Sequence, residues 1–233
     1  MRAGEGVAPS SKIAMKSSLL RRTGAFALLS PLLSLLLPLA LHAQSLPGPR
    51  EFYFDEDVST TRPVVLVAGS DDATQQRLLK AMKGRDRQAD LATGQLAHIA
   101  YASGRVDLGG LLYARVLASV EDNNSLHRPL LWNYGWDLYR SGDAEGALAR
   151  WREAGVDAFN NPAWVPPTVA LALWTLERRD EAVQWYATAV RTEPLRWGDP
   201  ANLPTLLPDW REQDRAKLAE VATAWRAAPP SWP

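Results

Sequence analysis

Small residues recur along this chain at a spacing that limits its possible folds more than any other feature of the sequence. One series stands at positions 97, 135 and 170, and a second at positions 109, 147 and 182. Both series step by 38 residues and then by 35, so the distance along the chain between the two small residues is the same in every unit. Apolar residues at helical spacing flank a turn signal in each unit, which predicts a pair of helices. We therefore expect an all-α chain of repeated helix-turn-helix units.

The three units cover about 90–121, 128–159 and 163–194. A small residue on each first helix lets the second helix approach closely, and a large aromatic residue on each second helix fills the gap between successive units. One hairpin cannot bury its own apolar face, so about three must stack. The residues expected to make this packing are Leu96, Ala97, Gly109, Tyr113, Tyr134, Gly135, Ala147, Trp151, Ala154, Val169, Ala170, Ala182, Tyr186, Ala189 and Pro194.

The pattern over about 90–194 resembles the tetratricopeptide repeat (TPR) family, and segment 163–194 is the most specific match. The resemblance implies a short α-solenoid of about three repeats with capping helices at its ends. The last repeat departs from the family in having Pro166 where a large aromatic residue is usual, and Glu121 and Phe159 stand where the first two repeats would close with proline. These departures affect the boundaries of the repeats more than their assignment.

The flanking segments fit a helical domain over 71–228. Residues 72–82 predict a lone helix before the first repeat, capped by Ser70 or Asp71. Residues 208–228 predict a terminal capping helix, with Trp210 and Leu218 among its apolar positions. Residues 44–70 show no useful periodicity and predict a linker or an extended, mostly irregular arm.

The first 43 residues have the order of a secretory signal peptide: a basic segment, an apolar run from Ala25 to Leu41, and a small residue at Ala43. The start of translation is Met1 or Met15. Cleavage after Ala43 predicts a periplasmic or secreted protein with no stable membrane span. The alternative is an inner-membrane anchor through residues 25–41, which is at the short limit for a bilayer and contains two prolines.

Several function classes are excluded or disfavoured by composition. The chain has no Cys, so disulfides, thiol nucleophiles and Cys-ligated metals are excluded. Its 26 basic and 26 acidic residues argue against a nucleic-acid partner. Neither an HExxH motif nor a Gly-x-Ser-x-Gly motif occurs. The acidic run Asp55-Glu56-Asp57 is expected to be solvated. We therefore expect no enzymatic activity, no cofactor and no metal.

The TPR resemblance also implies a concave groove lined by the first helices, where a partner peptide binds. The Lys and Asn residues of the family's carboxylate clamp are not reproduced, since Gly94 and His98 stand at two of the matching positions and Trp164 and Thr168 at two others. All ten Trp residues lie after residue 131, which concentrates them in this region. The residues that the alignment places in the groove are Tyr101, Trp132, Asn133, Trp136, Tyr139, Arg140, Trp164 and Trp174.

These features predict a non-catalytic, exported scaffold that binds an envelope protein or peptide in its aromatic groove. A bacterial source is indicated weakly by 21 Arg against 5 Lys. The alternative function is a glycan- or peptidoglycan-binding module that uses the Trp-rich surface. Two structural alternatives stay open: the aromatic residues pack in the core, or the arm 44–70 or the capping helix fills the groove.

Overall fold

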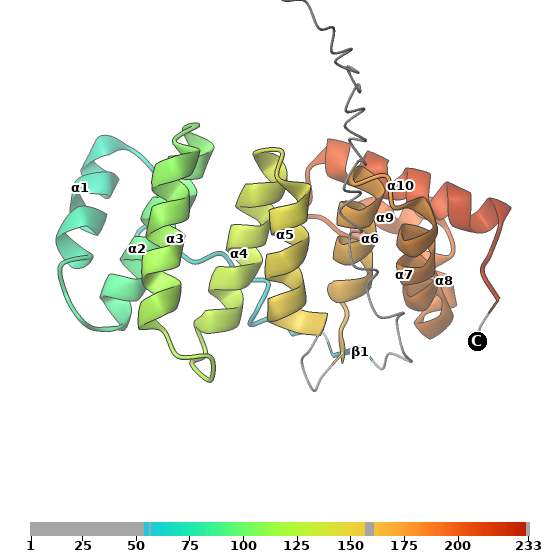
Figure 1. Ribbon diagram of the computed structural model, residues 1–233, viewed down its shortest axis with the longest axis horizontal. Helices are drawn as coiled ribbons and strands as arrows, with labels where there is room; N and C mark the ends of the chain where they lie inside the picture. Colours follow the sequence, from blue (N-terminus) through green and yellow to red (C-terminus); the bar gives the residue numbers. More distant parts are fainter. Residues whose placement is uncertain (1–53, 56, 157–160, 232–233) are drawn as a thin grey trace, which may run out of the picture. The chain divides into compact units, whose positions relative to one another are not determined.

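The computed structural model describes residues 54–55, 57–156 and 161–231, all within one compact unit, Gln44–Pro233. The expected signal peptide and anchor segment, and residues 44–53 of the arm, lie outside the described residues. The described part is helical, which confirms the all-α prediction (Figure 1). The elements in chain order are β1 Phe54–Asp55, α1 Asp72–Ala81, α2 Arg87–Ala102, α3 Val106–Ser119, α4 His127–Arg140, α5 Ala144–Trp151, the π-helical turn Arg152–Val156, β2 Asn161–Pro162, α6 Val165–Thr175, α7 Arg179–Thr192, α8 Pro194–Trp197, the 3-10 turn Pro200–Asn202, α9 Leu203–Leu206 and α10 Glu212–Ala227.

Six of the helices form three hairpins in which α2 packs on α3, α4 on α5, and α6 on α7 (Figure 1). Neighbouring hairpins meet through α2 and α3 against α4, and through α5 against α6. At the two ends, α1 packs on α2, while α10 packs on α6 and α7. The two-residue strands β1 and β2 pair in parallel, with Phe54 opposite Asn161.

The three hairpins turn in the same way. In each turn a backbone N–H bonds to a carbonyl five residues earlier, which satisfies a carbonyl at the end of the first helix. The residue before that N–H has positive φ: Gly104 at 75°, Gly142 at 97° and Glu177 at 59°. The three bonds join Arg105 to Ala100 (2.8 Å), Asp143 to Leu138 (2.9 Å) and Arg178 to Leu173 (2.9 Å), so they follow the same 38- and 35-residue steps.

Glycines mark the places where the two helices of a hairpin come closest. A Cβ on Gly135 of α4 would lie only 2.2–2.7 Å from the indole of Trp151 on α5. The Trp151 side chain is completely buried there, and its Nε1 donates to the carbonyl of Trp132 at 3.2 Å. The equivalent aromatic residues Tyr113 and Tyr186 are also completely buried. The small residue and the large aromatic residue of a hairpin thus fit each other directly.

Two boundaries differ from the sequence predictions. The terminal helix begins at Glu212 rather than 208, because Arg211 has an extended backbone, and Trp210 lies before the helix. Pro194 does not simply close the third repeat; it is the first residue of α8, which follows α7 after one residue. Helix α1 begins as predicted, with the Asp71 carboxylate accepting from the N–H of Thr74 at 2.7 Å.

Over the residues that the structure describes, none of the helices is long and apolar enough to cross a membrane.

Adjacent glycines on α3 provide a matched test of the close packing. Replacing Gly109 with Ala should destabilise the fold by about 1–3 kcal/mol, because its Cβ would lie 2.4 Å from Cδ2 of Tyr101 and 3.1 Å from the carbonyl oxygen of Ala97. The control Gly110→Ala meets no atom closer than 3.7 Å and should stabilise the helix by about 0.5–1 kcal/mol. Urea unfolding of both variants measures the difference. Equal effects would contradict the assigned helix contact.

Candidate functional site

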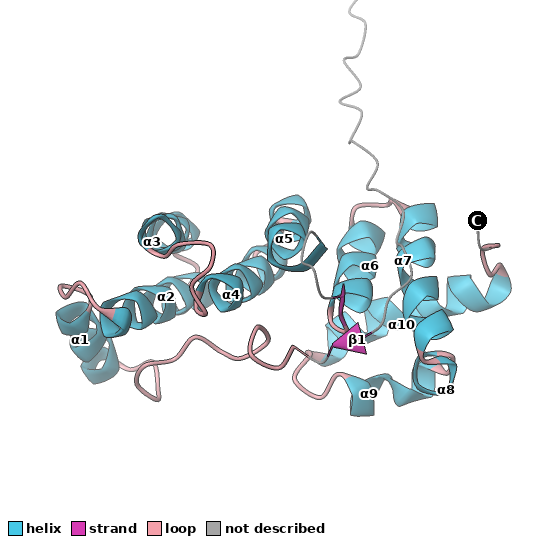
Figure 2. Ribbon diagram, turned by 90° about the horizontal axis from the view of Figure 1, so that it is seen from below, coloured by secondary structure: helices cyan, strands magenta, loops and turns pink. Residues whose placement is uncertain are grey.

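The arm that precedes α1 lies along α2 and α4, where the sequence predicted an open groove (Figure 2). The buried Gln95 of α2 binds the main chain of the arm through both ends of its amide. Its Oε1 accepts from the N–H groups of Leu66 (2.9 Å) and Val67 (3.1 Å), and its Nε2 donates to the carbonyl oxygens of Val67 (2.6 Å) and Gly69 (3.3 Å). This side of the groove is therefore occupied by the chain itself.

The other end of the arm is held by a carboxylate. Asp57 accepts from Nη2 of Arg128 at 2.7 Å and from Nε1 of Trp164 at 3.1 Å. Only 7% of the Asp57 side chain is exposed, so the expectation that the acidic run 55–57 is merely solvated is wrong for this residue. Between the two ends, Asn133 donates to the carbonyl of Arg62 at 2.9 Å, and Val64 is buried.

A cavity of about 390 Å³ remains between this arm and the C-terminal segment. Val58, Thr61 and Pro63 of the arm form one side, and Leu206–Trp210 form another. Helix α4 supplies the largest part of the remaining wall, and the segment at the start of α6 and helix α8 supply much of the rest. We call this cavity the aromatic pocket; its principal lining side chains are Trp132, Trp136, Trp164, Trp197 and Trp210, together with His98, Asn133, Asp137 and Arg140.

The indoles of the pocket pack edge to face. Trp132 and Trp164 have ring centroids 4.7 Å apart at 62°, and Trp136 and Trp210 have centroids 4.8 Å apart at 76°. Each of the four is 6–8% exposed and belongs to the largest core cluster. Offset edge-to-face contacts of this kind stabilise a core beyond the burial of area alone. The same tryptophans thus support the fold and form the wall of the pocket.

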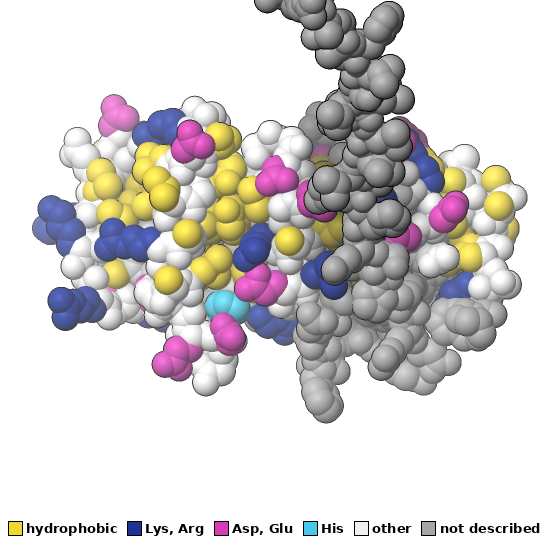
Figure 3. Space-filling view, viewed as in Figure 1, with side chains coloured by type: hydrophobic (Ala, Val, Ile, Leu, Met, Phe, Trp, Pro, Cys, Tyr) yellow, Lys and Arg dark blue, Asp and Glu magenta, His cyan; other side chains and the backbone are white. Residues whose placement is uncertain are grey.

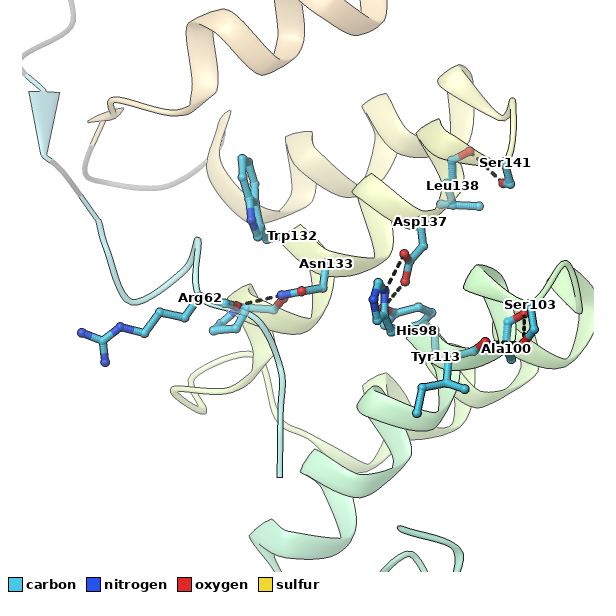
Figure 4. A network of polar contacts seen from close by, with 12 residues as sticks. Arg62, His98, Ala100, Ser103, Tyr113, Trp132, Asn133, Asp137, Leu138 and Ser141 are labelled. Carbon is cyan, nitrogen blue, oxygen red and sulfur yellow. Dashed lines mark hydrogen bonds and ion pairs between the residues drawn. The ribbon is translucent and has the colours of Figure 1, made fainter. Parts of the chain in front are cut away.

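A chain of polar contacts reaches the pocket from the interface between the first two hairpins (Figure 4). The Asp137 carboxylate of α4 is 4% exposed and accepts from the Tyr113 hydroxyl at 2.7 Å, while its other oxygen contacts Nδ1 of His98 at 2.8 Å. The hydrogen bond to Asp137 raises the pKa of His98 above 6.5. Burial, with the nearby Asp137, raises the pKa of Tyr113 well above its usual value. His98, which lines the pocket, is therefore protonated more readily than an ordinary histidine.

Arg140 lies at the C-terminal end of α4 on the wall of the pocket. Its guanidinium carbon is 4.8 Å from the ring centre of Trp136, a distance suited to a cation-π interaction. Its Nε is buried and has no hydrogen-bond partner among the described residues. Burial lowers the pKa of this group, and the charge of Arg211 lowers it further.

The structure brings together five of the eight residues predicted to line the groove and separates three. Trp132, Asn133, Trp136, Arg140 and Trp164 meet in the aromatic pocket. The ring of Tyr101 lies beside those of Tyr113 and Tyr134. The hydroxyl of Tyr139 is hydrogen-bonded to that of Thr175 at 3.0 Å. The indole N–H of Trp174 donates to Glu220 on α10 at 2.8 Å. These three therefore lie outside the aromatic pocket.

Sequence reasoning missed several residues of the pocket. Asp137 is a lone acidic residue between Trp136 and Leu138 on an apolar stretch, and that context signals a buried carboxylate in need of partners. His98 was considered only as a departure from the family's clamp. Trp210 was assigned to the capping helix, whereas it packs on Trp136.

The aromatic pocket offers a ligand several kinds of contact. The pocket combines apolar ring surface with a guanidinium, an amide and a histidine. Its lining contains neither Ser nor Cys, and the described residues contain no group of three or more side chains suited to hold a metal ion.

The bonds from Gln95 to the arm can be tested by amide exchange. Gln95→Ala should increase hydrogen exchange at Leu66 and Val67 by at least about tenfold, because hydrogen bonds worth about 1–3 kcal/mol are lost. Gln184→Ala, a change at an exposed glutamine, is the control. Unchanged exchange at the two arm amides in Gln95→Ala would show that the arm is held in another way.

His98 should make stability depend on pH. Since its pKa is higher in the folded protein than 6.5, the Asp137 contact stabilises the fold fully below about pH 6.5 and less as the pH rises through the folded pKa. His98→Gln should therefore cost more stability at pH 5.5 than at pH 8.5. A pKa for His98 at or below 6.5 in an NMR titration, unchanged in Asp137→Asn, would refute the coupling.

Comparison of the chain with models of known protein families, with curated proteins and with solved structures found no match.

Proposed function

We propose that this protein is a non-catalytic, exported helical scaffold of the TPR type that binds a protein partner in the cell envelope through the aromatic pocket. The observation that carries the proposal is the meeting of Trp132, Trp136, Trp164 and Arg140 in one cavity beside polar groups. Trp and Arg are the side chains most enriched at the energetic centres of protein interfaces.

The arrangement of the hairpins supports the TPR part of the proposal. Three hairpins with the same turn hydrogen bond follow one another at the spacing of the sequence repeat. Helices α1 and α10 pack at the two ends, in the places where a short α-solenoid needs caps. Export and the envelope location are supported by the order of residues in the first 43 positions.

The size of the pocket supports insertion of a few side chains rather than a whole helix. A volume of about 390 Å³ is at the lower end for ligand sites, and the arm takes up the adjoining surface of α2 and α4. A loop or extended segment of a partner can place one or two side chains there.

A glycan-binding function is the second candidate. It is favoured by the presence of several indoles beside the Asn133 amide and the exposed Asp209 carboxylate, since sugar rings stack on aromatic faces while their hydroxyls bond to polar groups. The edge-to-face contacts among the indoles use part of their ring faces internally, which favours the protein partner.

Site-specific photo-crosslinking in the native envelope tests the proposal. A photo-reactive amino acid at Asp209, an exposed position at the edge of the pocket, should give a discrete protein adduct. The control position is Leu111 of α3, which is 70% exposed. Exposed hydrophobic side chains are also seen elsewhere on the face shown in Figure 3. No adduct at Asp209, or the same adducts at both positions, would count against the proposal. Saturable quenching of Trp emission by cell-wall oligosaccharides would favour the glycan-binding function instead.

A further inference from the structure

Arg140 is a cation in the wall of the aromatic pocket to which no described residue is hydrogen-bonded through Nε. The side chain is partly exposed, and the nearby charges of Asp214 and Asp137 offset its positive charge in part. Its ring contact with Trp136 keeps it against the wall of the pocket. Its guanidinium therefore has hydrogen-bond donors available to a ligand that enters the cavity.

The other charged groups of the lining are already paired or face outward. Asp137 is bound by Tyr113 and His98, and Glu193 pairs with Arg196 at 2.9 Å. The exposed side chain of Asp209 is at the edge of the pocket. Neither Asp137 nor Glu193 is therefore hydrogen-bonded to Arg140.

Two further charges near Arg140 lie outside the lining. Arg211 is close enough to lower the pKa of both Arg140 and His98, so it adds to the positive potential. Asp214 is buried; burial raises its pKa, while the charges of Arg140 and Arg211 lower it. Its charge in turn raises the pKa of Arg140, so it offsets part of the positive potential, and its Oδ2 has no hydrogen-bond partner among the described residues.

The arm shows how the same face holds an acidic peptide segment. Asp57 is bound by a guanidinium and an indole together, those of Arg128 and Trp164. Arg128 stands near the beginning of α4 and Arg140 at its end, 12 positions and about 18 Å apart along the helix. At the second position a guanidinium and an indole are again together, as Arg140 over the ring of Trp136, with no carboxylate hydrogen-bonded to Nε of Arg140 among the described residues.

Resting on the proposed function, we infer that the aromatic pocket binds an acidic side chain within an extended segment of the partner. The carboxylate pairs with Arg140, whose planar guanidinium can donate two parallel hydrogen bonds, and with the imidazole of His98. An apolar neighbour of the acidic residue packs against Trp136 and Trp210. Recognition requires no free chain end.

Capped pentapeptides that differ in one atom group test the inference. Calorimetric titration of the full chain compares acetyl-AFEFA-amide with acetyl-AFQFA-amide, in which an amide replaces the only carboxylate. The Glu peptide should bind at least about tenfold more tightly. Arg140→Gln should abolish this preference, and His98→Gln should reduce it. Arg196→Gln, which changes a lining arginine already paired with Glu193, should leave it intact.

The same titrations separate failure of this inference from failure of the proposed function. Equal binding of the two peptides, or a preference that survives Arg140→Gln, overturns the acidic recognition while leaving a pocket that binds protein. Binding of neither peptide also overturns it, and the Asp209 crosslink then decides the proposed function independently. If the protein binds neither peptide but prefers glucuronate to glucose, the inferred peptide ligand is wrong and the ligand is a sugar acid. If Arg140→Gln melts at a markedly lower temperature, Arg140→Lys replaces it and should weaken the preference several-fold.

Discussion

The buried carboxylate of Asp137 joins the first two hairpins and determines much of what surrounds it. A charge in the interior is tolerated only when hydrogen bonds replace its lost hydration. Here one oxygen is satisfied from α3 by Tyr113 and the other from α2 by His98, so a residue of α4 ties together both helices of the preceding hairpin. The same bonds fix the orientation of the His98 ring. An element of the hairpin interface therefore becomes part of the pocket wall.

The repeat could be predicted because it depends on side-chain size at fixed intervals. Gly135 and Trp151 form a pair in which one residue must be small for the other to fit, and such a requirement leaves a direct mark on the sequence. The turns leave a weaker mark. Two use glycine at the left-handed position, but the third uses Glu177, so a search for glycine alone detects only the first two. The start of α10 depends on the backbone of Arg211, for which the residue pattern carries no signal.

The pocket was only partly predictable because its limits are set by segments that lack periodicity. Gln95 and Asn133 bind main-chain groups of the arm, and such groups leave no side-chain pattern in the sequence. The TPR resemblance implied that Trp132, Trp136 and Trp164 line one surface, and the structure places all three in the aromatic pocket. The resemblance could not show that the arm would cover the N-terminal half of α4, or that Trp210 would reach Trp136 from outside a helix. For these tryptophans the sequence leaves core packing and ligand binding as alternatives. In the structure the rings are nearly buried and also line a cavity.

The arm has a consequence for how the molecule opens. In a stack of hairpins each unit touches only its neighbours, so terminal units can fray without the rest. Here Asp57 contacts Arg128 and Trp164, which are 71 and 107 residues further along the chain, and β1 pairs with β2. Residues before the first helix thus bind beside the third hairpin, while Gln95 holds them to the first. The arm therefore links the first hairpin to the third, in addition to the contacts between neighbouring hairpins. We expect the hairpins to unfold together rather than one by one from an end.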